Sequence, residues 1–329
     1  MMSSGVRLHP TEDRDFWGRF VADHPGSTAF SDWEWLDFQA DLLGVRIERF
    51  VIAAGGRPVG VFAAPRRSAR SLVSGVLPFP FVGPLVAPEL LSATIAAFRH
   101  WQLKSGLLVA RFDLGPADVG SDTADLLRAA HLEVREDATV IVDMAHGSVQ
   151  KLREAYTKSR RAKVRRAARE GVTVRLARPG EFAELVPHLL HETYGAREQP
   201  SPYPADVGTR FEQWAAGREW VTTWVVTVGD ELAGTQVMLG RHPTAIAWVG
   251  GCLRRFRASA PDVLLCDGML EGAVERGHTA VDFSGWVDDG IGSYKLAFGG
   301  QRYDYLGVQS FVPTIARSGM RRAIALIRR

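Results

Sequence analysis

The chain has 329 residues, of which 46% are hydrophobic and 23% charged, a composition typical of a soluble globular protein of about two domains. Its net charge of +3 is small, so local basic surfaces, and not the overall charge, would have to attract a polyanion. The sequence contains no run of about 18 apolar residues, which excludes a predicted membrane-spanning helix.

The two cysteines and the N-terminus indicate the compartment. Cys252 and Cys266 have no metal-ligand spacing, which favours a reducing compartment over a zinc site or a disulfide framework. The N-terminal sequence MMSSGVRLHP has no apolar core of signal-peptide length. We therefore expect a cytoplasmic protein without a bound metal.

The first 50 residues predict a strand and two helices. Residues 6–25 are typical of a short strand followed by a helix, and residues 31–43 of a second helix. The second helix carries Trp33 and Trp35, which are two positions apart and therefore face opposite ways. We expect one of them to line a surface or cleft, and interior packing of both is the alternative.

The rest of the first half completes a small α/β unit. Two alternating apolar runs flank Gly55 and Gly56 and predict a hairpin. A loop rich in Pro and Gly, a helix stopped by Gly106 and a buried strand that ends near Asp113 follow. A helix and a final strand at residues 138–144 close the unit.

The central sequence YTKSRRAKVRRAAREG, residues 156–171, predicts a basic helix. Ala and Arg are strong helix formers, no proline interrupts the segment, and Gly171 stands at a C-terminal stop position. Seven basic side chains are set against one acid, Glu170. Such a helix attracts polyanions by counterion release, and an ordinary solvated surface helix is the alternative.

The second half repeats the pattern of the first. Strand, helix, hairpin, strand, helix and strand follow one another over residues 172–286. Gly60 aligns with Gly234 at an offset of 174, and Asp113 aligns with Phe283 at an offset of 170. Near-constant offsets indicate an internal repeat. The order of elements predicts an α/β (α+β) chain in which each copy has a mixed sheet with helices on both faces.

Three stretches resemble a known family. They are SDWEWLDF near the N-terminus, SRRAKVRRAAREGVTV in the centre and HTAVDFSGWVDDGIGSYKLAFGGQRYDYLG in the C-terminal half. The order of elements is similar to the GNAT acyltransferase fold. A tandem pair joined by a basic helix resembles the Fem family of aminoacyltransferases, and the third stretch carries the most specific part of the resemblance.

The resemblance implies both an architecture and an activity. Residues 1–150 and 172–329 would be two tandem GNAT-like domains, and residues 151–171 a basic linking helix. The activity would be transfer of an amino acid from aminoacyl-tRNA, the co-substrate, to an amine, with an amide bond formed and no cofactor. The acceptor would be a peptide bearing an amine, such as a nucleotide-linked peptidoglycan precursor or a small peptide natural product. The alternatives are an acyl-CoA-dependent N-acyltransferase and a non-catalytic nucleic-acid-binding protein.

Two residues are the predicted catalytic groups. Lys295 lies between glycine-rich turns after a predicted strand, and the resemblance implies that its ammonium stabilises the oxyanion of the tetrahedral intermediate. A surface contact of a loop lysine is the alternative. Asp113 ends the equivalent strand of the first copy, at the edge where open α/β sheets bind ligands. The resemblance implies that it holds or deprotonates the acceptor amine, and turn capping is the alternative.

The resemblance also implies residues that bind the acceptor. Arg197 and Tyr203 lie in a loop and are similar to an Arg and a Tyr that grip an anionic acceptor. Gln39 stands where many cell-wall members carry a lysine, which leaves the acceptor open. The expected substrate-binding residues are Trp35, Gln39, Arg197, Tyr203, Ser284, Trp286 and Tyr294.

Basic residues in three places could contact nucleic acid. The segment CLRRFRASAPDVLL stands where acyl-CoA-dependent GNAT enzymes have a glycine-containing pyrophosphate turn, but it lacks those glycines and Pro261 removes a donor. The C-terminal residues 317–329 predict a short basic helix that packs on the protein, binds RNA or touches an anionic membrane. The expected tRNA-binding residues are Lys158, Arg160, Arg161, Lys163, Arg165, Arg254, Arg255 and Arg257.

Overall fold

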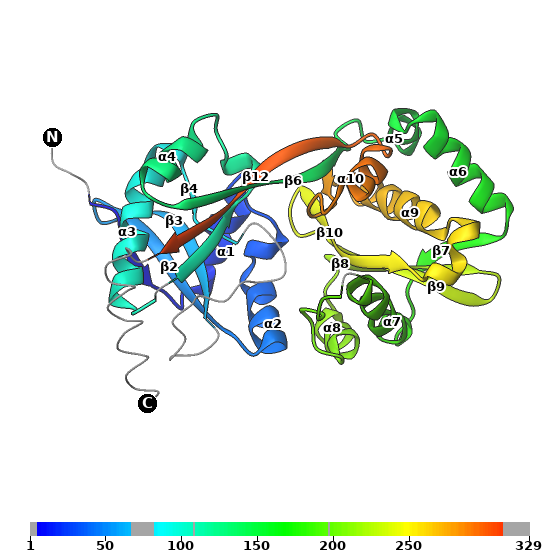
Figure 1. The fold of residues 1–329 in the computed structure, drawn as a ribbon, viewed down its shortest axis with the longest axis horizontal. Coiled ribbons are helices and arrows are strands. Elements are labelled where there is room, and N and C mark those ends of the chain that lie inside the picture. Colours follow the sequence, from blue (N-terminus) through cyan, green and yellow to red (C-terminus); the bar gives the residue numbers. More distant parts are fainter. Residues whose placement is uncertain (1–4, 67–81, 108, 197, 312–329) are drawn as a thin grey trace. The chain divides into compact units, whose positions relative to one another are not determined.

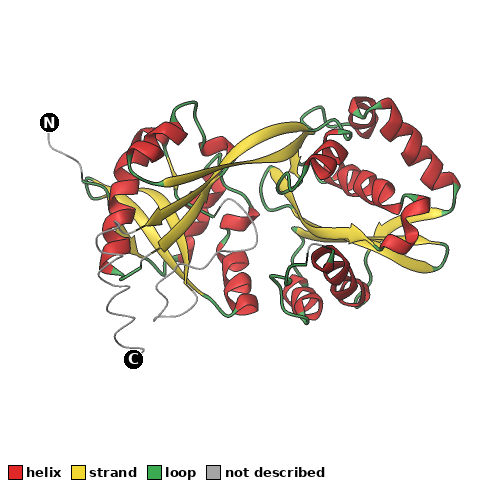
Figure 2. Ribbon diagram, viewed as in Figure 1, coloured by secondary structure: helices red, strands yellow, loops and turns green. Residues whose placement is uncertain are grey.

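The computed structural model of the protein describes residues 5–311 except 67–81, 108 and 197. These residues divide into two compact units. Unit 1 contains the chain up to Asp137 and from Asp304 onward, and unit 2 contains Ala138–Tyr303. In each unit a β-sheet is flanked by helices (Figures 1 and 2). The basic C-terminal segment, residues 317–329, lies outside the described residues.

Unit 1 is built on an antiparallel sheet with the order β1-β2-β3-β4 and on the antiparallel pair β5-β12. Its core joins both sheet segments to α3 through aromatic side chains, with Phe98 packed edge-on against Phe62 and Phe112. Its helices and strands are β1 (Arg7–Pro10), α1 (Arg14–Asp23), α2 (Trp33–Leu43), β2 (Arg46–Ala54), β3 (Arg57–Arg66), β4 (Leu85–Val86), α3 (Leu91–Lys104), β5 (Val109–Leu114) and α4 (Thr123–Ala129).

Unit 2 has the sheet order β6-β11-β10-β9-β8-β7. Helix α9 packs on one face of β7, β8 and β9, and α7 packs with α8 on the opposite face (Figure 1). Its helices and strands are α5 (Val149–Ala155), α6 (Lys158–Arg169), β7 (Val172–Leu176), α7 (Glu181–Gly195), α8 (Val207–Ala215), β8 (Val221–Val228), β9 (Glu231–Leu239), β10 (Thr244–Cys252), α9 (Pro261–Glu275), β11 (Ala280–Asp282) and α10 (Asp289–Leu296).

Two long strands, β6 (Glu133–Asp143) and β12 (Gln301–Phe311), have residues in both units. Strand β6 follows the first repeat in sequence but pairs with β11 of unit 2, and β12 follows the second repeat but pairs with β5 of unit 1. The repeats therefore exchange their last strands. This exchange is the reason that the units divide at residues 137 and 303, whereas local sequence patterns place the divisions at residues 150 and 172.

The internal repeat is visible in backbone detail. The β2–β3 hairpin shifts register between Ile52 and Ala53, and the β8–β9 hairpin shifts between Val226 and Thr227, an offset of 174 in both cases. Gly60 lets the next strand approach closely, since a Cβ there would lie 2.6 Å from the carbonyl oxygen of Leu85. The equivalent Gly234 does the same for β10. Both units are thus versions of one design, as the sequence predicts.

The tryptophans of α2 do not form a surface. Trp33 is 7% exposed and Trp35 is 0% exposed, so the expectation that one of them lines a surface is wrong. The physical reason is that both faces of α2 are covered. The ring of Trp17 packs edge-on against Trp33, while Phe30 stacks on Trp35.

The central basic helix is confirmed with shorter bounds. Thr157 caps the N-terminus of α6 by accepting a hydrogen bond from Arg160 N at 3.3 Å, and Gly171 follows the helix with a φ of 80°. The sequence did not predict the preceding helix α5 or the helix α10. Lys295, expected between turns, lies in α10, whose N-cap Asp288 accepts a hydrogen bond from Ile291 N.

Within the part of the chain that the structure describes, no helix combines the length and the hydropathy that a membrane crossing needs.

Candidate active site

A cavity of about 580 Å³ opens in unit 2 where two parallel strands part. Strands β10 and β11 pair only from Thr244 to Ile246 and from Ala280 to Asp282. Beyond this point β11 ends, while β10 continues beside β9 with a register shift after Ala247. The space left beside β10 is closed by α9 and α10. Its lining includes Gln236, Trp248, Cys252, Arg257, Asp262, Cys266, Phe283, Ser284, Tyr294 and Lys295.

Lys295 lines this cavity and is held by the loop after β11. Its Nζ donates to the carbonyl oxygens of Phe283 at 2.9 Å and Gly285 at 2.5 Å. No further hydrogen-bond partner of Nζ is found among the described residues, so one of its three N–H donors is available to a ligand. The lysine is therefore fixed in position before any ligand binds, as electrostatic stabilisation of a transition state requires.

The loop that holds Lys295 has an unusual backbone. Ser284 and Val287 adopt φ values of 54° and 64°, in the left-handed region, although neither is glycine. A β-branched residue in this region is a conformational outlier, and such strain persists only where surrounding contacts enforce it. The two carbonyl oxygens that flank Ser284, those of Phe283 and Gly285, both accept hydrogen bonds from the ammonium group of Lys295.

The same loop is anchored by the buried Asp282, which is 2% exposed. Its Oδ1 accepts hydrogen bonds from Thr139 Oγ1 at 2.5 Å and from Ser284 N at 2.7 Å. Thr139 in turn accepts a hydrogen bond from Gly285 N at 3.0 Å. Burial raises the pKa of Asp282 to about 6, while these hydrogen bonds and Lys295 lower it. Asp282 therefore positions the loop, and Thr139 is a member of the site that the sequence did not reveal.

Burial controls the charge of Lys295. It lowers the pKa of the ammonium group from 10.5 to about 8, against the opposing effects of Asp282, Cys266 and Asp288. Lys295 is thus mostly a cation at neutral pH, but it becomes neutral at a pH where other lysines remain charged.

Arg160 links α6 to α10, the helix that carries Lys295. It is 6% exposed and donates to the carbonyl oxygen of Tyr294 at 2.9 Å. Its guanidinium lies 4.2 Å from the centre of the Tyr294 ring and 4.3 Å from that of Phe298. The expectation that Arg160 contacts tRNA is wrong in this structure, because its side chain is enclosed by α10. It instead fixes the helix that carries Lys295.

The other predicted basic residues fall into two groups. In one group the side chains have partners: Arg161 donates to the carbonyl oxygen of Glu154, Arg254 to that of Glu192, and Arg255 pairs with Glu231. In the other group no ion pair is found among the described residues. Its members are the exposed Lys158, Lys163 and Arg165 of α6, and Arg257 at the cavity.

The predicted substrate-binding residues of unit 2 gather only in part. Ser284 and Tyr294 line the cavity with Lys295. Tyr203 is not in the lining but contacts Trp248, which is. Its hydroxyl accepts a hydrogen bond from the indole of Trp248 at 3.1 Å. Trp286 is not in the lining and packs on Gly292 of α10, where any Cβ would clash with the indole. Arg197 lies outside the described residues.

The predicted residues of unit 1 do not belong to this cavity. Asp113 is half-buried in β5, and its pKa is raised to about 6 by burial, which Arg135 counteracts. Trp35 and Gln39 are 0% exposed, so neither presents a surface to a substrate in this structure. The expected substrate contacts of these two side chains are therefore wrong here, because α2 is covered on both faces.

The start of α9 differs from a phosphate-binding helix terminus. Ala260 has a φ of 49°, Pro261 is the first helical residue and lacks an N–H, and Asp262 places a carboxylate in the first turn. Both Pro261 and Asp262 line the cavity. A carboxylate at this position opposes the binding of a pyrophosphate by the helix N-terminus.

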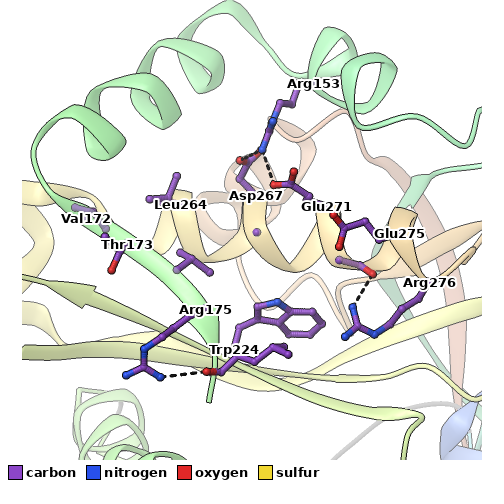
Figure 3. Close-up of a pocket in the computed structure, with 14 residues that line it drawn as sticks. Arg153, Val172, Thr173, Arg175, Trp224, Leu264, Asp267, Glu271, Glu275 and Arg276 are labelled. Atoms are coloured by element: carbon purple, nitrogen blue, oxygen red, sulfur yellow. Dashed lines mark hydrogen bonds and ion pairs between the residues drawn. The ribbon is translucent and has the colours of Figure 1, made fainter. Parts of the chain in front are cut away.

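A second cavity of unit 2, of about 420 Å³, is lined by α9, β7 and Trp224 (Figure 3). Across its rim Arg153 of α5 donates to both carboxylate oxygens of Asp267, at 3.1 and 2.7 Å, and to Glu271 at 2.8 Å. The Asp267 side chain is only 3% exposed, so this ion pair fixes α5 on α9. Lys295 is not in the lining of this second cavity.

Replacing Arg153 with alanine should destabilise unit 2. Asp267 would then be buried without a counter-charge, which typically costs about 3 kcal/mol. Urea unfolding measures the loss. The control is Arg255→Ala, whose ion pair with Glu231 is exposed and should contribute less than about 1 kcal/mol. Equal stability of Arg153→Ala and the unmodified protein would contradict the structural role of this pair.

Comparisons with known proteins place this geometry in a known fold. Residues 155–303 match the family model described as an acetyltransferase (GNAT) domain. FemX is similar with a TM-score of 0.69 and 15% identity over 91% of this chain and 96% of FemX. A tandem GNAT protein from the clavulanic acid biosynthesis pathway gives a TM-score of 0.58, 16% identity, and coverage of 94% and 99%. No curated protein matches the sequence.

The chain has the tandem GNAT fold of Fem-like proteins. A further structure of this fold is L-PGS from Bacillus licheniformis, with a TM-score of 0.56 and 14% identity over 90% of this chain and 91% of that one. The GNAT fold explains the position of the cavity. In the GNAT domain of unit 2 the cavity lies where two parallel strands part, past the carboxyl end of β11 and beside β10, close to the edge where open α/β sheets bind ligands.

Proposed function

We propose that the protein transfers an aminoacyl group from a charged tRNA to an amine and thereby forms an amide bond. The observation that carries the proposal is Lys295, a cation fixed by two carbonyl oxygens, with one donor free, in a cavity of the GNAT domain. The fold similarity to FemX and to L-PGS supports the same class of reaction.

The chemistry needs little beyond positioning and charge. The acceptor amine attacks the carbonyl carbon of the aminoacyl ester, and a C–N bond forms as the carbonyl oxygen becomes an oxyanion. The free N–H of Lys295 stabilises that oxyanion. When the intermediate collapses, the C–O bond to the ribose breaks and the ribose oxygen takes a proton. The amine loses one proton in the reaction and the ribose oxygen gains one, so the protons balance.

The proposed function also implies an acceptor substrate and a compartment. An amine-bearing peptide, free or linked to a nucleotide, is the proposed acceptor. We propose that the reaction takes place in the cytoplasm, where charged tRNA is found. If the acceptor is lipid-linked, the basic C-terminal segment would provide peripheral contact with the membrane.

The test is a transfer assay with labelled amino acids on total tRNA and a panel of peptide and nucleotide-linked amines. Product that disappears after RNase treatment of the donor supports the proposal. Product that survives RNase and requires acyl-CoA supports the alternative, which the acetyltransferase model makes the principal rival. Pro261 and Asp262 disfavour that rival, because they remove a donor and add a negative charge where CoA pyrophosphate would bind.

Charge reversal on α6 should weaken tRNA binding. Lys158 and Arg165 lie seven positions apart and so share one exposed face of the helix. Replacing both with glutamate should raise the Kd for tRNA about tenfold and reduce the salt dependence by about two phosphate contacts. Filter binding at several salt concentrations measures both quantities. The control replaces the exposed Arg19 and Arg46 of unit 1 with glutamate, and equal effects of the two pairs would contradict the proposed surface.

The pH profile separates two roles for Lys295. As an oxyanion-stabilising cation, it should make kcat fall as the pH rises through about 8, where the ammonium loses its proton. If Lys295 acted as a general base instead, kcat would rise as the pH increases through the same range. Single-turnover rates with a preloaded donor measure the profile. In Lys295→Arg the guanidinium stays charged, so any remaining activity should lack the fall near pH 8.

A further inference from the structure

The cavity that holds Lys295 also contains a carboxylate with no partner. Asp262 is half-buried in the first turn of α9, and it forms no hydrogen bond or ion pair with any described residue. By contrast, Asp267 pairs with Arg153 and Glu181 pairs with Arg175. The carboxylate oxygens of Asp262 are therefore available to accept hydrogen bonds from a cationic ligand.

Asp262 and Lys295 line the same cavity, Asp262 from the first turn of α9 and Lys295 from α10. Burial raises the pKa of Cys252, Cys266 and Tyr294, and the negative charge of Asp262 raises all three further. Lys295 acts on Cys266 with the opposite sign and lowers its pKa. Cys266, which also lines the cavity, therefore experiences both charges, and the lining carries the carboxylate of Asp262 together with the cations of Lys295 and Arg257.

A buried hydroxyl in the same lining also lacks a partner. The Oγ of Ser284 is enclosed and has no hydrogen-bond partner among the described residues. Ser284 is the second residue after β11 and lies in the loop that holds Lys295. The cavity thus offers an anion, two cations and a free hydroxyl to one occupant. A purely apolar acyl chain would leave the anion and the hydroxyl unpaired.

We propose that Asp262 binds the α-ammonium group of the aminoacyl donor, an inference that rests on the proposed function. The α-amino group has a pKa of about 8 in peptides, so it is largely a cation at neutral pH. It is bonded to the carbon next to the reacting carbonyl. An aminoacyl ester therefore presents a cation to Asp262 while its carbonyl oxygen faces Lys295. An acetyl group presents no cation, and Asp262 thereby selects aminoacyl over simple acyl donors.

The experiment compares an aminoacyl-tRNA with the same tRNA carrying the N-acetylated amino acid. The unmodified protein should prefer the free ammonium at least about tenfold in kcat/KM, as expected where a charged partner is lost. Asp262→Asn should reduce that preference to about threefold or less, and Asp262→Glu should restore part of it. Glu275→Gln is the matched control, because it removes one negative charge from the same helix outside this cavity.

A binding measurement makes the test independent of turnover. The probes are an adenosine with an aminoacyl group in a stable amide linkage at its 3′ position and the N-acetylated form, titrated by calorimetry. Loss of the difference between the two probes in Asp262→Asn supports the inference, and an unchanged difference overturns it. If the unmodified protein fails to use charged tRNA, the proposed function falls, while this titration still decides whether Asp262 recognises an ammonium group. Equal melting temperatures show that the variants are folded.

Discussion

Lys295→Met is expected to lower kcat about 10²- to 10³-fold, the loss typical when one donor to an oxyanion is removed. Methionine has a similar length and no charge, so it fills the same space beside the carbonyl oxygens of Phe283 and Gly285. The affinity for charged tRNA should stay the same, because the lysine acts on charge that develops only in the transition state. Single-turnover rates and tRNA binding on the same preparation separate the two effects.

The stability of the same variant provides a check on folding and on the charge of the buried lysine. Burial lowers the pKa of Lys295 to about 8, so between pH 8 and its ordinary pKa of 10.5 the unfolded chain binds more protons than the native one. The native protein should therefore gain stability as the pH rises through this window. Lys295→Met should lack this gain. A variant that loses activity together with its cooperative unfolding would instead indicate a structural role.

Arg160→Ala is expected to lower kcat about 10- to 100-fold by loosening the helix that carries Lys295. The guanidinium is enclosed between the rings of Tyr294 and Phe298 and donates to the Tyr294 carbonyl oxygen. Its removal leaves a cavity and an unpaired acceptor in the interior. Arg160→Lys should not restore the rate, because an ammonium group cannot stack on two rings and reach the same carbonyl in the planar geometry of arginine.

The tRNA affinity of Arg160→Ala decides between the two roles considered for this residue. A side chain that is 6% exposed should contribute little to the binding of a polyanion, so the Kd for tRNA should change less than about threefold. The double replacement of Lys158 and Arg165 should show the opposite pattern, with weaker binding and an unchanged rate at saturation. A large loss of tRNA affinity in Arg160→Ala would contradict the assignment made from the structure.

The duplicated fold could be predicted because its signals are local. The hairpins with their equivalent glycines, Gly60 and Gly234, and the helices stopped by Gly106 and Gly277 are patterns of a few adjacent residues, and the structure confirms the repeat they indicate. The exchange of β6 and β12 could not be predicted, because a strand's own pattern does not state which sheet it joins. That choice depends on pairing partners more than 100 residues away.

A residue of the site could be predicted only where it stands in a recognisable motif and has a side chain suited to the reaction. Lys295 was identified in this way, and it lines the cavity. Thr139 was missed because its bond to Asp282 spans 143 positions. Arg160 was misjudged because a run of basic residues does not reveal which member turns inward. No sequence motif singles out Asp262, and only the cavity lining shows that it shares a space with Lys295.

The most direct test of aminoacyl transfer at the Lys295 cavity is a competition between two donors in one reaction. Charged tRNA with a tritiated amino acid and acetyl-CoA with a ¹⁴C label are offered together with an amine acceptor, and the label in the product is counted. The account predicts tritium in the amide product, little ¹⁴C, and the loss of tritium transfer in Lys295→Met. Product that carries ¹⁴C alone, or tritium transfer that survives Lys295→Met unchanged, would contradict it.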